Sequence, residues 1–142
     1  FFQLPIADLA VANNNFNFIE RLWMDWSPNW PGYEPYAKKT INVLSKESVL
    51  SKALAYYRCT FQESLQTERI NTLAEELMGQ KIKMPTLYLH GENDGCIGAN
   101  LSDGMENFFE DLQIKILPNC GHFLHLEKPE EVNKIILDFL SS

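Results

Sequence analysis

Two short apolar runs, each followed by a turn with a titratable side chain, most constrain how this chain can fold. The runs cover residues 85–90 and 112–117. Their length, their content of Leu, Ile and Tyr, and the Gly, Asn and Pro that close them predict buried β-strands. The segment between them, roughly 98–109, has room for a helix. We therefore expect two parallel strands joined by a right-handed βαβ crossover.

An acid and a histidine come directly after these strands. Asp94 follows the first strand in the sequence Gly-Glu-Asn-Asp-Gly, and His122 follows the second. Open α/β sheets place their chemistry at the carboxyl ends of their strands, so the two side chains are expected to lie close together. Histidine exchanges a proton near neutral pH, and a carboxylate holds its tautomer. The pattern predicts two members of a catalytic triad.

Both residues also have a structural interpretation. Asn93-Asp94-Gly95 is a common turn sequence, and a Gly-His pair after a strand is often structural. The order of the two motifs at successive strand ends favours the catalytic interpretation.

The rest of the chain is expected to be helical. Two parallel strands do not form a stable open sheet alone, so the chain is expected to be the second half of a larger α/β domain. Its first residue, Phe1, likewise suggests a start inside a longer gene product. The Asn run at 13–15 is expected to end the first helix. Helices are predicted over 6–12, 16–25, 35–44, 47–61, 68–80 and 129–140.

Charge and composition argue against several classes of partner. The net charge of the 142 residues is −7, without a Lys/Arg cluster, which argues against nucleic acid and anionic membranes. No apolar run approaches the ~18 residues of a membrane span. Cys59, Cys96 and Cys120 have no metal-ligand spacing. We expect a reduced, cytoplasmic protein without metal or cofactor.

The sequence Asn-Cys-Gly-His-Phe-Leu-His-Leu-Glu-Lys-Pro at 119–129, together with Gly91–Asp94, resembles the histidine and acid elements of α/β-hydrolase fold enzymes. It looks closest to the branch of epoxide hydrolases and haloalkane dehalogenases. Residues 2–5 and 55–58 are similar to cap segments of that branch. The resemblance implies an α/β-hydrolase fold fragment with a helical cap (lid) over residues 1–80. The last β-α-β-α units of a mostly parallel sheet would follow over 81–142.

The resemblance also implies roles for individual residues. His122 matches the catalytic histidine, Asp94 the triad acid, and Tyr57 a cap tyrosine that hydrogen-bonds an epoxide oxygen. The family nucleophile is an Asp or a Ser on a sharp strand-to-helix turn, yet no Gly-x-Ser-x-Gly or Gly-x-Asp-x-Gly occurs in this sequence. The nucleophile is therefore expected upstream, in the missing N-terminal half of the same fold.

The function implied for the full-length parent is hydrolysis of a small apolar substrate, with an epoxide hydrolase-like Asp mechanism preferred. Haloalkane or haloacid dehalogenase and serine esterase are the alternatives within the fold. A binding module that has lost catalysis is the alternative outside enzymes. Alone, the fragment is expected to be inactive, and a homo-oligomer is one way for it to cover apolar edges.

Several side chains near these motifs are candidates for substrate binding, although packing is an equal interpretation of the tryptophans. His90 is interpreted as structural, and Cys96 and Cys120 as packing residues, because nothing nearby suggests thiolate activation. The acidic stretches 106–110 and 127–131 are interpreted as solvated faces. The substrate-binding candidates are Trp23, Trp26, Tyr56, Phe123 and His125.

Overall fold

The computed structural model describes residues 1–141, which form two compact units. The first unit comprises Phe1–Leu22 and Glu34–Gly79. The second comprises Trp23–Tyr33 together with the chain from Gln80 onward. The second unit is thus assembled from two separate stretches of the sequence. The division into cap and core at residue 80 stays a prediction.

The first unit is helical. Helix α1 (Ala7–Trp26) enters the second unit at its end, and it is broken at Asn13–Phe16. There Asn14, Asn15 and Phe16 have φ of 48°, 53° and 62°, a left-handed conformation that Asn tolerates better than most residues. The predicted break at the Asn run is confirmed.

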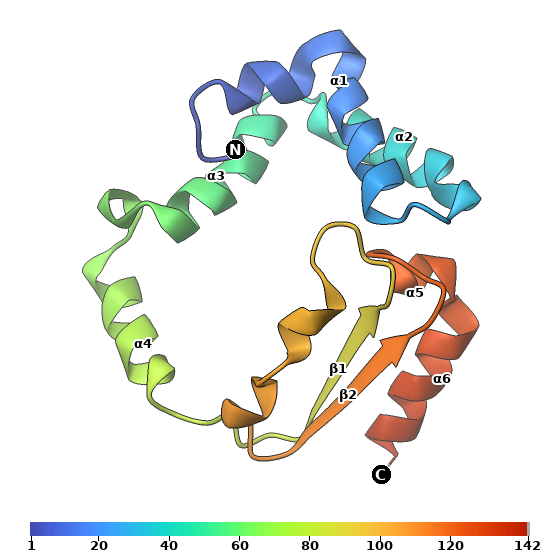
Figure 1. Cartoon of the computed structure of the whole chain (residues 1–142). Coiled ribbons are helices and arrows are strands. Elements are labelled where there is room, and N and C mark those ends of the chain that lie inside the picture. Colours follow the sequence, from blue (N-terminus) through green and yellow to red (C-terminus); the bar gives the residue numbers. More distant parts are fainter. Residues whose placement is uncertain (142) are drawn as a thin grey trace. The chain divides into compact units, whose positions relative to one another are not determined.

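Three further helices of this unit agree closely with the predicted ranges (Figure 1). They are α2 (Glu34–Leu44), α3 (Val49–Phe61) and α4 (Glu68–Met78). Arg58 of α3 forms an ion pair with Asp8 of α1, which ties these two helices together. The buried apolar residues of the unit are Ala7, Val11, Ile19, Ala37 and Leu54.

The second unit contains a parallel pair of strands, as predicted. Strand β1 (Thr86–Gly91) pairs with β2 (Leu112–Leu117) in a register that runs from Thr86 opposite Leu112 to Gly91 opposite Leu117 (Figure 1). Both strands therefore end at the same level, directly before the two predicted motifs.

The prediction of a helix between the strands is wrong. The connection instead contains two 3₁₀ turns, Ala99–Ser102 and Met105–Asn107. Gly104, which separates them, has a φ of 82°. An α-helix cannot pass through a residue in that conformation, so the segment folds as two short turns.

Two helices complete the second unit, α5 (Leu124–Glu127) and α6 (Pro129–Leu140). Pro129 occupies the first turn of α6, where its missing N–H costs no hydrogen bond. The core of this unit lies between α6 and the strand ends. It consists of Leu117, Cys120 and Val132, with Leu89, Leu124 and Ile135 packed against them.

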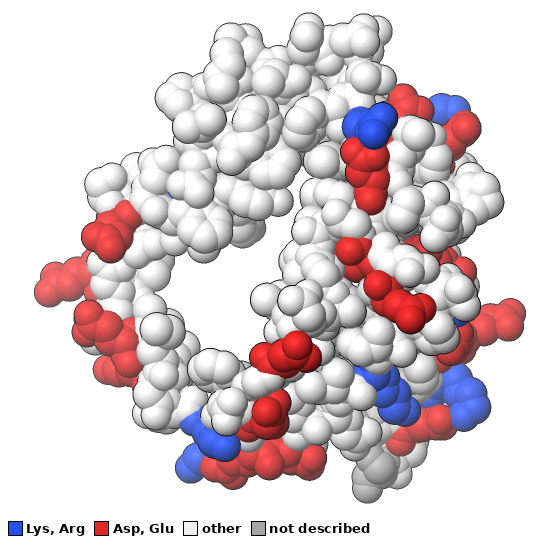
Figure 2. All heavy atoms as spheres, in the orientation of Figure 1, with Lys and Arg blue, Asp and Glu red and all other residues white. Residues whose placement is uncertain are grey.

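Figure 2 shows carboxylates spread over the visible face, with the Lys and Arg side chains interspersed among them rather than gathered into a basic surface. No helix formed by residues 1–141 combines the length and apolarity needed to cross a membrane.

Candidate active site

Asp94 and His122 meet at the carboxyl ends of β1 and β2. The distance between His122 Nδ1 and Asp94 Oδ2 is 2.8 Å. The carboxylate is buried, with 4% of the side chain exposed, whereas 28% of the His122 side chain is exposed. The acid thus lies beneath the imidazole, and the ring reaches the surface of the unit.

Asp94 is held in place by its own turn. Its Oδ1 accepts hydrogen bonds from the backbone N–H of Cys96 at 2.7 Å and of Ile97 at 3.0 Å. These bonds point Oδ2 toward His122. The turn interpretation and the pairing with His122 are therefore both correct, because each uses a different carboxylate oxygen.

The pKa of Asp94 lies below its ordinary value. Burial raises the pKa of this carboxyl, but the hydrogen bonds from Ile97, His122 and Cys96 more than offset that effect. Near neutral pH the carboxylate is ionised and can only accept, so a neutral His122 carries its proton on Nδ1. The lone pair of Nε2 is then the basic atom of the ring.

Aromatic side chains surround His122. Its ring makes edge contacts with Trp26, at 4.9 Å between ring centroids, and with Phe123, at 5.1 Å. Trp23 stacks on Phe123 at 3.8 Å, with 17° between the ring planes. Three of the five substrate-binding candidates, Trp23, Trp26 and Phe123, are thus brought together with the histidine.

Ser27 and Glu127 hold the loop that carries His122. Both carboxylate oxygens of Glu127 lie 3.0 Å from the N–H of Gly121, and Oε1 also accepts a 2.7 Å hydrogen bond from Ser27 Oγ. The same Oγ accepts the N–H of Phe123 at 3.2 Å. Ser27 is only 1% exposed. These contacts immobilise the residues on either side of the histidine.

The carbonyl of Trp26 connects the histidine loop to the acid loop. It accepts the N–H of His122 at 3.0 Å and the N–H of Gly95 at 3.1 Å. A single carbonyl oxygen therefore fixes two backbone positions, that of His122 and that of Gly95, the residue after Asp94. The end of α1, which the sequence placed in the cap region, contributes directly to the geometry of the pair.

Glycines allow these backbones to approach one another. A Cβ on Gly95 would lie 1.9 Å from the carbonyl oxygen of Asp25, and one on Gly121 would lie 2.7 Å from Ser27 Cα. A Cβ on Gly91 would likewise lie 2.1 Å from the carbonyl oxygen of Gly121. Side chains at these positions would push the acid and histidine loops apart.

Sequence reasoning missed Ser27 and Glu127. The interpretation of Glu127 as part of a solvated face was wrong, because the residue is half-buried and hydrogen-bonded to Ser27 and Gly121. A Glu six residues after Gly121 was the available signal. Ser27 lies in a Ser-Pro loop, and nothing local in the sequence indicates its distant partners.

The three remaining predicted residues lie on the helices α3 and α5. Tyr57 and Tyr56 lie on α3 of the first unit and are 41% and 79% exposed. The ring of Tyr57 packs on Phe2, with 4.7 Å between centroids. His125 is exposed on α5. The roles expected for these three residues stay predictions.

The cysteines near the pair have little thiolate character. Burial raises the pKa of the Cys96 thiol, and the charge of Asp94 raises it further. Burial also raises the pKa of Cys120. Cys120 is buried, in agreement with its interpretation as a packing residue, whereas Cys96 is exposed, so the packing interpretation of Cys96 is wrong. Within residues 1–141, no group of three or more His, Cys, Asp or Glu side chains is arranged to hold a metal ion.

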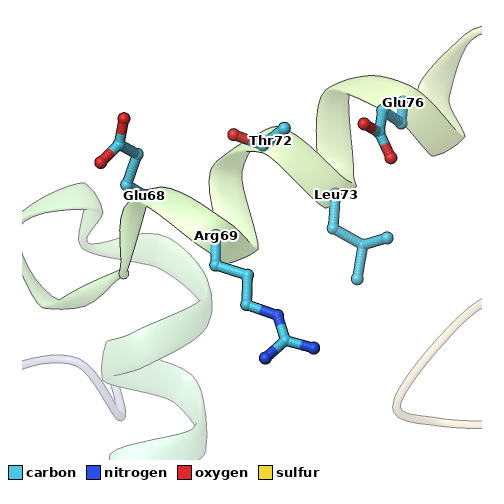
Figure 3. Close-up of a pocket in the computed structure, with 5 residues that line it drawn as sticks. All are labelled: Glu68, Arg69, Thr72, Leu73 and Glu76. Carbon is cyan, nitrogen blue, oxygen red and sulfur yellow. The ribbon is translucent and has the colours of Figure 1, made fainter.

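A surface depression runs along α4 in the first unit (Figure 3). Glu68, Arg69, Thr72, Leu73 and Glu76 line it, all from this one helix. None of these residues was a predicted site residue. Figure 3 shows their side chains projecting from several sides of the helix rather than converging on one point.

Comparison with known proteins gives a family match and several similar hydrolases. Residues 54–129 match the family described as the alpha/beta hydrolase fold. Epoxide hydrolase 3 of Xenopus tropicalis is 29% identical over 146 residues, which covers 98% of this chain and 37% of that protein. The monoacylglycerol lipase ABHD6 of Mus musculus is 32% identical over 88 residues, covering 62% of this chain and 26% of that protein.

A solved structure resembles the chain over nearly its whole length. The Cif epoxide hydrolase from Acinetobacter nosocomialis is 25% identical, with a TM-score of 0.76, and the match covers 98% of this chain and 43% of that one. The chain therefore spans less than half the length of each of these three proteins.

Proposed function

Because the chain belongs to the α/β-hydrolase fold family, we propose that it supplies the acid and the histidine of a hydrolase active site. Asp94 orients His122 and stabilises its charged form, and His122 activates water. The parent protein is epoxide hydrolase-like and acts on a small apolar substrate. The observation that carries this proposal is the 2.8 Å contact between His122 Nδ1 and Asp94 Oδ2 at the strand ends.

The first chemical step needs a nucleophile from outside this chain. An Asp carboxylate in the N-terminal half of the same fold attacks one carbon of the epoxide and forms an ester bond to it. The carbon–oxygen bond of the ring breaks, and Tyr57 donates a hydrogen bond to the oxygen as it gains charge. The product of this step is an alkyl-enzyme ester.

His122 acts in the second step. Its Nε2 removes a proton from water while the water oxygen attacks the ester carbonyl. The imidazolium that forms is stabilised by the ionised Asp94, whose pKa is low because its hydrogen bonds outweigh the effect of burial. The ester bond to the substrate breaks, the diol leaves and the carboxylate is restored. Overall one water is consumed, and its protons complete the two hydroxyl groups.

The surroundings of His122 support an apolar substrate. Trp23, Trp26 and Phe123 present aromatic surface beside the imidazole, and aromatic rings bind flat or apolar groups well. With Tyr56 and His125, these three aromatic residues form the proposed substrate-binding set. Residues 1–80 are assigned to the cap and 81–142 to the end of the core. The reaction uses no cofactor, and the parent is placed in the cytoplasm.

The similarity to a monoacylglycerol lipase favours ester hydrolysis as the second candidate function. In that case the nucleophile is a Ser, and the same acid–histidine pair serves acylation and deacylation. Both candidates need His122, so the nucleophile distinguishes them.

The test uses the full-length protein and its His122→Gln variant, with an aryl epoxide and a p-nitrophenyl ester as substrates. We expect the variant to lose about 10³-fold or more in kcat. With the epoxide, we expect intact mass spectrometry to detect the variant plus one substrate mass, since the ester forms but is not hydrolysed. Turnover of the p-nitrophenyl ester alone would establish the second candidate. Absence of turnover of both, or turnover indifferent to His122, contradicts both.

Tyr57 is tested separately. Tyr57→Phe should lower kcat on the epoxide by about 10- to 100-fold with little change in KM, because its hydrogen bond strengthens as charge develops. Tyr36→Phe on α2 is the matched control and should leave kcat unchanged. Equal effects of the two substitutions would remove Tyr57 from the mechanism.

A further inference from the structure

His90 is a buried titratable residue that the proposed mechanism does not use. It lies on β1, four residues before Asp94, and only 6% of it is exposed. Its Nδ1 lies 2.7 Å from the hydroxyl of Tyr88, and its Nε2 lies 2.9 Å from the carbonyl oxygen of Ile97. The same Nε2 is 3.4 Å from Asp94 Oδ2, the oxygen that binds His122.

The partners of His90 determine which ring nitrogen carries the proton. The Ile97 carbonyl can only accept, so Nε2 must donate to it. In the neutral ring Nδ1 is then an acceptor, and the Tyr88 hydroxyl donates to it. Burial raises the pKa of Tyr88, and the charge of Asp94 raises it further, so this phenol keeps its proton. The N–H of His90 is therefore directed at the Ile97 carbonyl, and its nitrogen lies 3.4 Å from Asp94 Oδ2.

Ile97 joins the two side chains into one unit. Its N–H donates to Asp94 Oδ1 at 3.0 Å, while its carbonyl accepts from His90 at 2.9 Å. The turn that positions the acid is thus held at Ile97 by two hydrogen bonds, one to the Asp94 carboxylate and one from His90. A change at His90 loosens the backbone that holds Oδ1 and removes a donor beside Oδ2.

We propose that Tyr88 and His90 are positioning residues for the acid–histidine pair: Tyr88 fixes the ring of His90, and His90 holds the Asp94 turn through Ile97 and places its Nε2 3.4 Å from the carboxylate oxygen that His122 uses. This inference rests on the proposed function of Asp94 and His122. The titratable groups that face the His90 ring are Tyr88 on its own strand and Asp94 on the following turn, with His122 on the other side of the carboxylate and Cys96 beside Asp94.

An N–H donor beside the Asp94 carboxylate partly offsets the electrostatic effect of its negative charge on neighbouring groups. When His90 is replaced by Leu, more of that charge acts on His122 and favours its protonated form. The acidic limb of kcat/KM should then move to higher pH by about one pH unit, a tenfold change in proton affinity. His90→Gln offers an amide N–H in place of Nε2 and should return the limb toward its original position.

The experiment compares the full-length protein with its His90→Leu, His90→Gln and Tyr88→Phe variants. Nitrogen-15 NMR of labelled histidines follows the His122 Nδ1 signal and the proton that it shares with Asp94, without any need for turnover. We expect His90→Leu to move both signals and His90→Gln to restore them. Tyr88→Phe, which removes the hydroxyl that donates to Nδ1, should shift the His90 Nδ1 signal, whereas Tyr36→Phe should leave that signal unchanged.

The outcomes separate this inference from the proposed function. If the His122 signals and the pH profile are the same in His90→Leu as in the unchanged protein, or if His90→Gln behaves like His90→Leu, the positioning role is wrong. If His90→Leu does not fold, an unchanged His90 Nδ1 signal in Tyr88→Phe overturns the role of Tyr88 and with it the proposal. Absence of hydrolysis, with the NMR responses as expected, contradicts the proposed function and leaves the positioning role supported.

Discussion

Ser27 and Glu127, one hundred residues apart in the chain, share a 2.7 Å hydrogen bond between Oγ and Oε1. Ser27 belongs to the short stretch Trp23–Tyr33, and Glu127 to the part of the second unit that contains the strands. Because Glu127 also accepts from Gly121, this bond fixes the loop on which His122 lies. The geometry of the proposed active site thus depends on a residue far from it in sequence.

Replacing Ser27 by Ala should destabilise the protein. The substitution leaves the N–H of Phe123 without its acceptor and takes a donor from Glu127, at a cost of about 1–3 kcal/mol in the free energy of unfolding. Urea unfolding of the full-length protein measures the difference. Ser51→Ala is the control, because the exposed Ser51 hydroxyl bonds only a nearby carbonyl, that of Ser48. Equal stability of the two variants would show that the buried bond contributes nothing.

A methyl group at Gly121 should be costly, and one at Gly79 should not. The Cβ of Gly121→Ala would meet the Cα of Ser27 and the carbonyl oxygen of Trp26, each at 2.7 Å, so the backbone must move at a cost of about 1–3 kcal/mol. Gly79→Ala meets nothing within 4 Å and should be neutral or slightly stabilising. Thermal unfolding of the two variants tests this contrast, and a Gly121→Ala protein as stable as Gly79→Ala contradicts it.

Asp94 should make stability fall at acid pH. Its pKa is lower in the folded protein than the ordinary value of 3.8, so the folded state favours the ionised form. This contribution is present above the unfolded pKa and is lost as the pH falls through the folded one. Urea unfolding between about pH 7 and pH 3 should therefore show a steeper acid decline than for Asp94→Asn. Parallel declines in the two proteins would mean that the low pKa is absent.

Alkylation of Cys96 should require unusually high pH. Burial and the charge of Asp94 both raise the pKa of this thiol, although the residue is exposed. Iodoacetamide reacts with the thiolate, so the labelling rate should rise only above the range of an ordinary thiol. In Asp94→Asn the rise should move to lower pH, because one of the two causes is removed. Cys59, exposed in the same chain, provides the internal reference, and identical profiles before and after the substitution contradict the expectation.

Local sequence patterns were sufficient for the parts of the fold that local interactions determine. Both strands, the break at Asn13–Asn15 and the proximity of Asp94 to His122 followed from apolar runs and from the turns that close them. Each strand and the break are determined within a few residues, whereas the proximity of Asp94 to His122 joins positions 28 residues apart and followed from the common edge at which parallel strands end.

The missed features depend on other information. The helix expected over 98–109 failed at Gly104, whose left-handed conformation the apolar pattern does not reveal. The contact between Ser27 and Glu127 has no local signature, because the two residues lie one hundred positions apart in the chain. Only the folded chain brings Trp23–Tyr33 against the strand ends, so its role there could not be predicted from periodicity.

The discontinuous second unit has a consequence for synthesis on the ribosome. Translation at roughly 5–20 residues per second places about 5–20 s between the emergence of Ser27 and that of Glu127. During that interval Trp23 lacks Phe123, on which it stacks in the finished protein. The nascent chain therefore carries Trp23 without this stacking partner until the segment around Phe123 leaves the exit tunnel, and apolar surface exposed in this way is what chaperones bind.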